Sequence, residues 1–161
     1  MVESPGSEKS EMKRTLLYVA MLTVALVIPV ERTNLEEMKP VEVVYLYEEA
    51  DLITLSTDTG DRGSGIDIPE AMSNLRQTTA GIIYLDTANY LLIGKETEVY
   101  VKELRPFLKD DVRICIAEGK IDMETVGQYL RVHQPEVKME DWATGSKLKT
   151  LKGNGGLKLV E

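Results

Sequence analysis

The chain has 161 residues, of which 43% are apolar and 29% charged, so it is long enough for one globular domain of ordinary composition. Its net charge is −8; the first 30 residues are neutral overall and the last 15 carry +3, so residues 31–146 carry −11. That charge would repel phosphate backbones, which argues against nucleic-acid binding. A single cysteine, Cys115, excludes an intrachain disulfide, and one cysteine with one histidine excludes a His/Cys metal cluster.

A polar tail and an apolar run open the chain. Residues 1–14 end in Lys13 and Arg14, and Thr15–Val30 then holds sixteen residues without a charge. That length is close to the minimum of about seventeen for a membrane-spanning helix. Because bases precede the run and acids follow it, the positive-inside rule predicts a cytoplasmic tail, a membrane anchor and an extracytoplasmic domain. A cleaved signal segment, and a buried soluble helix or strand, are the alternatives to an anchor.

A β-hairpin is predicted next. Residues 31–40 form a polar linker or a short turn of helix that Pro40 stops. Val41–Tyr47 alternates β-branched or aromatic residues with others, and Leu52–Thr57 is a second run of this kind. The two runs predict strands joined by a loop of about four residues.

A glycine-rich loop and a capped helix follow the hairpin. The loop is Thr57–Gly65, and Asp67 after it is a good N-cap with Glu70 at the capping-box spacing. One apolar face then predicts a helix over Ile68–Thr79. Ile82–Leu85 begins a further strand, which either continues through a bend into Tyr90 or ends in a loop before it.

The centre of the chain reads as strand, helix, strand. Tyr90–Ile93 is a short apolar run ended by glycine, and Val112–Ala117 is a second run of the same kind. Between them, Glu96–Lys109 places apolar residues on one helical face. This pattern is typical of a βαβ unit with a parallel strand pair. Pro106 either kinks the helix or ends it near Leu104.

The C-terminal part predicts one more helix and a hairpin. Asp122 caps a helix that ends near His133, before Pro135. Leu148–Leu151 and Leu157–Val160 flank a GNGG turn and form a cationic hairpin at a sheet edge.

Together these elements predict an α/β (mixed α+β) fold: one domain with a mixed β-sheet, a βαβ unit and about three helices, preceded by an N-terminal membrane helix. The expected organisation is a cytoplasmic tail over residues 1–14, a membrane anchor or signal segment over residues 15–30, and the α/β domain over residues 40–135. Residues 136–161 then form a C-terminal extension with a β-hairpin.

The glycine-rich loop is the strongest candidate for a ligand site, because backbone N–H groups between a strand and a capped helix can hold an anion. Its glycine order is not the dinucleotide pattern, and three aspartates oppose an anion. A cation is the alternative ligand, although the spacing is not that of an EF-hand. A plain connecting loop is the interpretation that the residues favour over a ligand site. The candidate ligand residues are Asp58, Gly60, Asp61, Gly63, Gly65 and Asp67.

The sequence offers little else for chemistry, and we expect no catalytic residue, cofactor or metal site. Asp58-Thr59-Gly60 resembles the triplet of aspartic proteases, but such enzymes need two aspartates that share one proton. Cys115 lies inside a strand pattern and is expected to be a small core residue. His133 is expected at the surface or at the end of a helix.

The order of elements resembles the N-terminal domain of the Ger(x)C family, the C subunits of spore germinant receptors. The match covers about residues 15–133. An apolar segment precedes Val30-Glu31-Arg32-Thr33-Asn34-Leu35-Glu36-Glu37, which stands where the family has a W-D-R-x-E-L-N-like stretch. Leu91-Leu92-Ile93-Gly94-Lys95-Glu96 resembles a V-L-V-I-G-E strand end. Lys109-Asp110-Asp111-Val112-Arg113 and Ala117-Glu118-Gly119 occupy the places of R-D-P-E-I-R and A-E-G.

The resemblance implies a non-enzymatic accessory or scaffolding role in a spore-forming bacterium. The family's lipid-accepting cysteine is absent, with Val30 near its place, and Asp86 stands where the family tends to have a Gly-His pair. Without that cysteine, we expect attachment through Thr15–Val30 as a helix. The resemblance covers none of the two further domains that follow in the family.

We thus expect a membrane-anchored, non-catalytic interaction or scaffold protein with protein partners in a cell or spore membrane complex. An extracytoplasmic module that binds a small ligand or cation through the loop from Asp58 to Asp67 is the first alternative. A hydrolase that uses Asp58 is the second.

Overall fold

The computed structural model describes residues 16–21, 23, 38–142, 146–154 and 156–161. These fall in two units, Met1–Asn34 and Leu35–Glu161. In the first unit, residues 16–21 and 23 are helical. The rest of the predicted segment Thr15–Val30 lies outside the described residues, as does the predicted linker up to residue 37.

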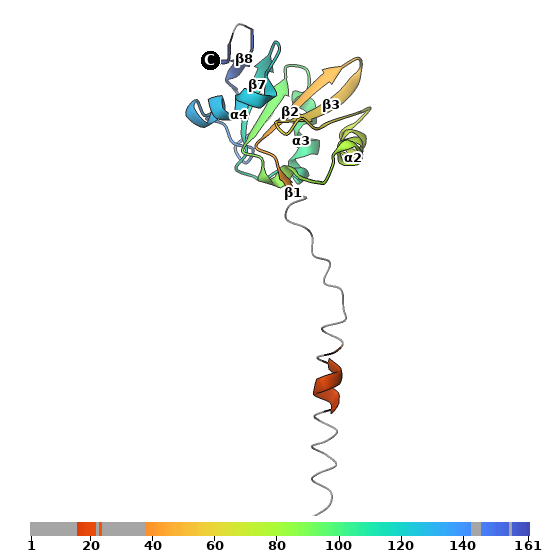
Figure 1. Ribbon diagram of the computed structural model, residues 1–161. Coiled ribbons are helices and arrows are strands. Elements are labelled where there is room, and N and C mark those ends of the chain that lie inside the picture. The colour runs from red at the N-terminus through yellow and green to blue at the C-terminus, as the bar shows by residue number, and fades with distance from the viewer. Residues whose placement is uncertain (1–15, 22, 24–37, 143–145, 155) are drawn as a thin grey trace, which may run out of the picture. The chain divides into compact units, whose positions relative to one another are not determined.

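A seven-stranded mixed sheet forms the centre of the second unit (Figure 1), in the order β4-β3-β2-β6-β7-β8-β9. The four central strands β2, β6, β7 and β8 run parallel, and the pairs at both ends are antiparallel. This arrangement confirms the predicted mixed α/β fold. The strands are β2 (Val43–Glu49), β3 (Leu52–Thr57), β4 (Arg62–Gly65), β6 (Tyr90–Gly94), β7 (Arg113–Glu118), β8 (Thr150–Lys152) and β9 (Lys158–Val160).

The hairpin of β2 and β3 has a tighter turn than the four residues expected. The register pairs Glu49 with Leu52, so only Ala50 and Asp51 form the turn. Both have positive φ values, 52° and 64°, as a type I′ turn requires. That turn type matches the twist of the two strands, so β2 continues through two glutamates that the sequence assigned to the loop.

A second, two-stranded parallel sheet joins β1 (Met38–Pro40) to β5 (Ile82–Tyr84). The prediction of a linker or helical turn was wrong for residues 38–40, which form β1. A 3-10 turn, η2 (Leu85–Thr87), separates β5 from β6, so the two are not one bent strand. The Thr87 hydroxyl ties this turn to the segment between β1 and β2, because it accepts from the Val41 N–H and donates to the Val41 carbonyl.

Helices cover both faces of the large sheet. On one face, α2 (Ile68–Thr78) and α3 (Val101–Leu104) pack in a core with alternate residues of the strands, such as Val44, Leu91 and Ile114. On the other face, α4 (Met123–Val132) packs over Val43, Tyr90 and Cys115 and their neighbours. Figure 1 shows α2 and α4 at opposite sides of the view. The result is a three-layer arrangement with a separate core on each face.

The helix predicted over Glu96–Lys109 is shorter than expected. It is built of η3 (Glu98–Tyr100), α3 and η4 (Arg105–Phe107). Of the two effects predicted for Pro106, a kink or an end near Leu104, the second is observed, since α3 ends at Leu104. Proline lacks the N–H that would continue the helix. The βαβ unit is confirmed, since β6 and β7 on either side of α3 are parallel neighbours.

The C-terminal segment joins the same sheet. The predicted hairpin is present as β8 and β9, and β9 is an edge strand. Residues 136–161, expected as an extension, also bury Trp142, Leu148 and Leu151 in the two cores. An α4 side chain covers part of the edge, because the Leu159 N–H donates to the Tyr129 hydroxyl over 2.8 Å.

Candidate functional site

Asp58, the first residue of the predicted ligand loop, binds the backbone of the neighbouring strand. Its carboxylate accepts the N–H groups of Glu42, at 3.1 and 3.3 Å, and of Val43, at 3.2 Å. Its own N–H donates to the Val43 carbonyl. The side chain therefore fixes the start of β2, as an N-cap fixes the start of a helix.

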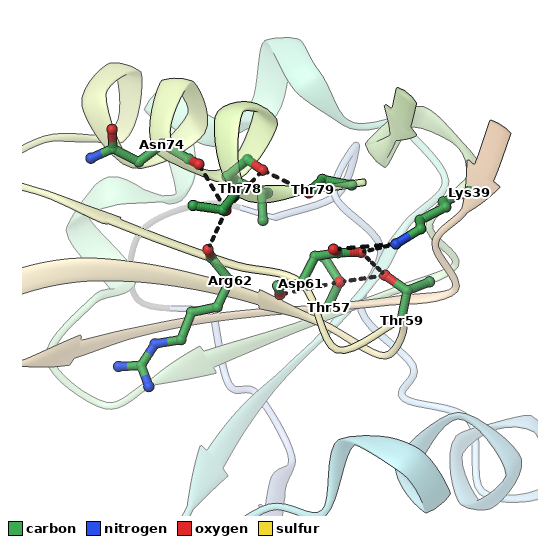
Figure 2. Close-up of polar contacts among 9 residues, drawn as sticks. Lys39, Thr57, Thr59, Asp61, Arg62, Asn74, Thr78 and Thr79 are labelled. Carbon is green, nitrogen blue, oxygen red and sulfur yellow. Dashed lines mark hydrogen bonds and ion pairs between the residues drawn. The ribbon is translucent and has the colours of Figure 1, made fainter. Parts of the chain in front are cut away.

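Asp61 and Gly60 form the outer turn of the same loop. The Asp61 carboxylate accepts from the Thr59 hydroxyl at 2.7 Å and from the Lys39 ammonium at 3.4 Å. Figure 2 shows these contacts together with the Thr57 hydroxyl, which lies 2.8 Å from that of Thr59. The turn thus links the large sheet to β1.

Gly63 and Gly65 lie in β4, a strand that the sequence assigned to the loop. A Cβ on Gly63 would stand 2.3 Å from the Leu75 nitrogen, and one on Gly65 2.5 Å from the Ala71 nitrogen. The backbone of α2 thus packs directly on β4. The two glycines serve helix packing, which explains their presence without a ligand.

Polar side chains of α2 also cover the outer edge of β4. The Thr78 hydroxyl donates to the Arg62 carbonyl at 2.9 Å (Figure 2), and the Asn74 amide donates to the Ser64 carbonyl at 2.6 Å. Asp67 caps α2 by accepting the Glu70 N–H at 2.8 Å, as predicted. An edge closed in this way is protected from pairing with another chain.

The six predicted ligand residues therefore do not converge on one point. Asp58 binds the backbone at the start of β2, and Gly60 and Asp61 form the outer turn. Gly63 and Gly65 pack against α2, and Asp67 caps it. Within the described residues, no group of three or more His, Cys, Asp or Glu side chains could hold a metal ion.

Two adjoining hollows of about 570 and 380 Å³ lie at the amino ends of the parallel strands, where β2, β6 and β7 begin, and Asp58 lines the larger one. They share Glu42, Asn89 and Arg131. We call them the amino-edge groove. Its lining is polar in most positions and consists of Pro40, Val41, Glu42, Asp58, Thr87, Asn89, Tyr90, Asp111, Arg113, Arg131 and Gln134.

A bidentate ion pair crosses this groove. Arg131 in the last turn of α4 donates to both carboxylate oxygens of Glu42, with Nε 2.6 Å from Oε1. The Glu42 hydrogen bond and charge raise the pKa of the Arg131 guanidinium. The pair joins α4 to the start of β2, and a base near a helix C-terminus also suits the helix dipole.

Tyr90 and Arg113 stand side by side in this groove, as register partners at the first positions of β6 and β7. Burial and the Glu42 charge raise the pKa of the Tyr90 hydroxyl, and the charges of Arg113 and Arg131 lower it in part. With its pKa raised, the phenol is protonated at neutral pH and can donate a hydrogen bond.

The groove was not predicted from the sequence, because its residues are scattered along the chain. The positions of three of them could have indicated it, since Glu42 and Asn89 come directly before strands and Arg113 begins one. The amino ends of parallel strands meet at one edge of a sheet. Only the pairing of β6 with β7 was predicted, however, and the parallel pairing of β2 with β6 was not.

The remaining candidates have structural places. Cys115 is buried in the core between α4 and the large sheet, as predicted, and burial raises the pKa of its thiol to about 12. His133 is exposed, forms the C-cap of α4 and stacks on Tyr129 with ring centroids 4.5 Å apart, in line with its expected place.

No helix among the described residues is both long and apolar enough to cross a membrane.

No family model, curated protein or solved structure matches this chain.

Proposed function

We propose that this protein is a membrane-anchored, non-catalytic interaction protein, and that its extracytoplasmic α/β domain binds a protein partner through the amino-edge groove. We further propose that it works in a membrane complex of a spore-forming bacterium, in germination or sporulation. The Ger(x)C-like order of its elements supports this second part.

The groove is the observation that carries the proposal. It is an open hollow lined by acidic and basic side chains, and the Glu42–Arg131 ion pair joins α4 to the start of β2 there. Polar side chains that are already held by hydrogen bonds suit recognition, because they lose less conformational freedom when a partner binds. Asp58, which a hydrolase would need as a catalytic group, has its carboxylate bound to two backbone N–H groups. That arrangement favours a structural role over a catalytic one.

The anchor is supported by the described part of the first unit. Five of its helical residues are apolar or aromatic: Leu16, Leu17, Tyr18, Val19 and Met21. At about 100° per residue they point to all sides of the helix, a pattern typical of a membrane segment. The Thr23 hydroxyl donates to the Val19 carbonyl at 2.7 Å, so the helix itself satisfies this polar group.

Purification of the tagged full chain from native membranes in a mild detergent tests the proposal. We expect a stoichiometric protein partner. Gln134→Trp, which places a large ring in the groove on an exposed position, should abolish its recovery. Gln77→Trp makes the same change on the exposed side of α2, away from the groove, and should retain the partner. Recovery of the wild-type chain alone would contradict the proposal.

A further inference from the structure

The acidic side chains of the amino-edge groove all have partners. Glu42 pairs with Arg131, and Asp58 accepts two backbone N–H groups. Asp111 lies 3.7 Å from the Lys109 ammonium. A cation entering the groove would therefore have to displace existing contacts.

Donors in the same groove are less well satisfied. Tyr90 is only 4% exposed and lines the smaller hollow, yet its hydroxyl has no hydrogen-bond partner among the described residues. The half-buried Arg113 guanidinium donates to the Pro135 carbonyl at 2.7 Å, and in the described part of the chain no carboxylate pairs with it. One neutral acceptor leaves most of its five N–H donors for a ligand.

The Asn89 amide adds a further donor. Its oxygen accepts from the Lys109 ammonium at 2.7 Å, which leaves the NH2 group for a ligand in the hollow. Arg113 and Tyr90 are register partners on adjacent parallel strands, so their side chains leave the same face of the sheet. Three kinds of donor side chain thus line the same hollow.

We infer that the amino-edge groove binds a carboxylate, held by the Arg113 guanidinium and the Tyr90 hydroxyl and assisted by the Asn89 amide. A guanidinium binds a carboxylate through two parallel hydrogen bonds, which gives both strength and orientation. A singly charged group suits this site better than a phosphate, because the carboxylates of Glu42 and Asp111 line the same hollow.

Two sources could supply the carboxylate: an acidic side chain of a protein partner, or a free small acid. The inference rests on the proposed function only for the first of these sources. The full chain in a neutral detergent can be titrated with sodium succinate and, separately, with an end-blocked peptide that contains two glutamates. Calorimetry measures the affinity of each chain, and shifts of the Arg113 side-chain N–H resonances in the wild-type chain place the binding at this site.

We expect Arg113→Gln to weaken binding by about 10- to 100-fold, as for loss of a charged hydrogen-bond partner. Tyr90→Phe removes only the hydroxyl, keeps the buried ring, and should weaken binding by about 2- to 10-fold. Arg105→Gln removes an exposed cation outside the groove, paired with Asp110, and should leave binding unchanged. Thermal melting of each variant checks that it is folded.

Binding of succinate and peptide alike would support a site open to free acids, and binding of the peptide alone would support a partner side chain. Failure of both probes to bind the wild-type chain, or equal affinity for wild type and Arg113→Gln, would overturn the inference. If a partner is still captured from membranes by Arg113→Gln, the proposed function stands, and only a partner side chain as the source of the carboxylate is excluded.

Discussion

Replacing Gly63 by alanine is expected to destabilise the domain by about 3 kcal/mol or more. The new Cβ would stand 2.3 Å from the Leu75 nitrogen and 2.4 Å from the Ala71 carbonyl oxygen, both in the backbone of α2. Backbone atoms of a packed helix cannot rotate away as a side chain can. The helix would have to move off β4, which would also stretch the Thr78 and Asn74 contacts to that strand. Urea unfolding followed by circular dichroism measures the loss.

Gly60→Ala is the matched control for this prediction. Gly60 lies in the same loop region with a φ of +85°, and no atom lies within 4 Å of its added Cβ. Its replacement therefore costs only the left-handed backbone strain, about 1–2 kcal/mol. If Gly63→Ala proved no more destabilising than Gly60→Ala, direct packing of α2 on β4 would be wrong.

Replacing Asp58 by alanine is expected to lower the free energy of unfolding by about 2–3 kcal/mol. The change leaves the N–H groups of Glu42 and Val43 without the carboxylate that they share. Val43 is fully buried, so water cannot readily replace the lost acceptor. The start of β2 also carries Glu42, so this strand end should loosen together with the amino-edge groove.

Asp58→Asn distinguishes a structural Asp58 from a catalytic or cation-binding one. Asparagine keeps one acceptor oxygen, and we expect it to recover roughly half of the stability that alanine loses. If Asp58 were instead catalytic or cation-binding, both variants would keep the stability of the wild type. They would lose an activity or calcium binding. Parallel measurement of stability and of calcium titration separates the two accounts.

Helices α2 and α4 could be predicted closely because their signals are local. Asp67 and Asp122 cap them, and the carboxylates accept N–H groups two or three residues away. The apolar face of each helix repeats within a few turns. The βαβ unit was predictable for a similar reason, since two apolar runs and the helix between them span only about thirty residues.

Strand β4 could not be predicted from its own residues, Arg62–Gly65, because none of them is apolar. Its conformation comes from pairing with β3 and from the close approach of α2, which are contacts made only in the folded domain. The groove was hidden for the same reason, as the Glu42–Arg131 pair joins residues 89 positions apart. Neither partner stands in a motif that marks it.

Fractionation of growing and sporulating native cells, with an antibody to residues 40–161, tests the central claim of a membrane-anchored complex most directly. We predict protein of full mass in alkali-washed membranes, enriched in spores. Full-length protein in the membranes of growing cells alone would support the membrane anchor and contradict the proposed role in spores. Soluble protein of reduced mass would contradict the account, because it would mean that Thr15–Val30 is a cleaved signal.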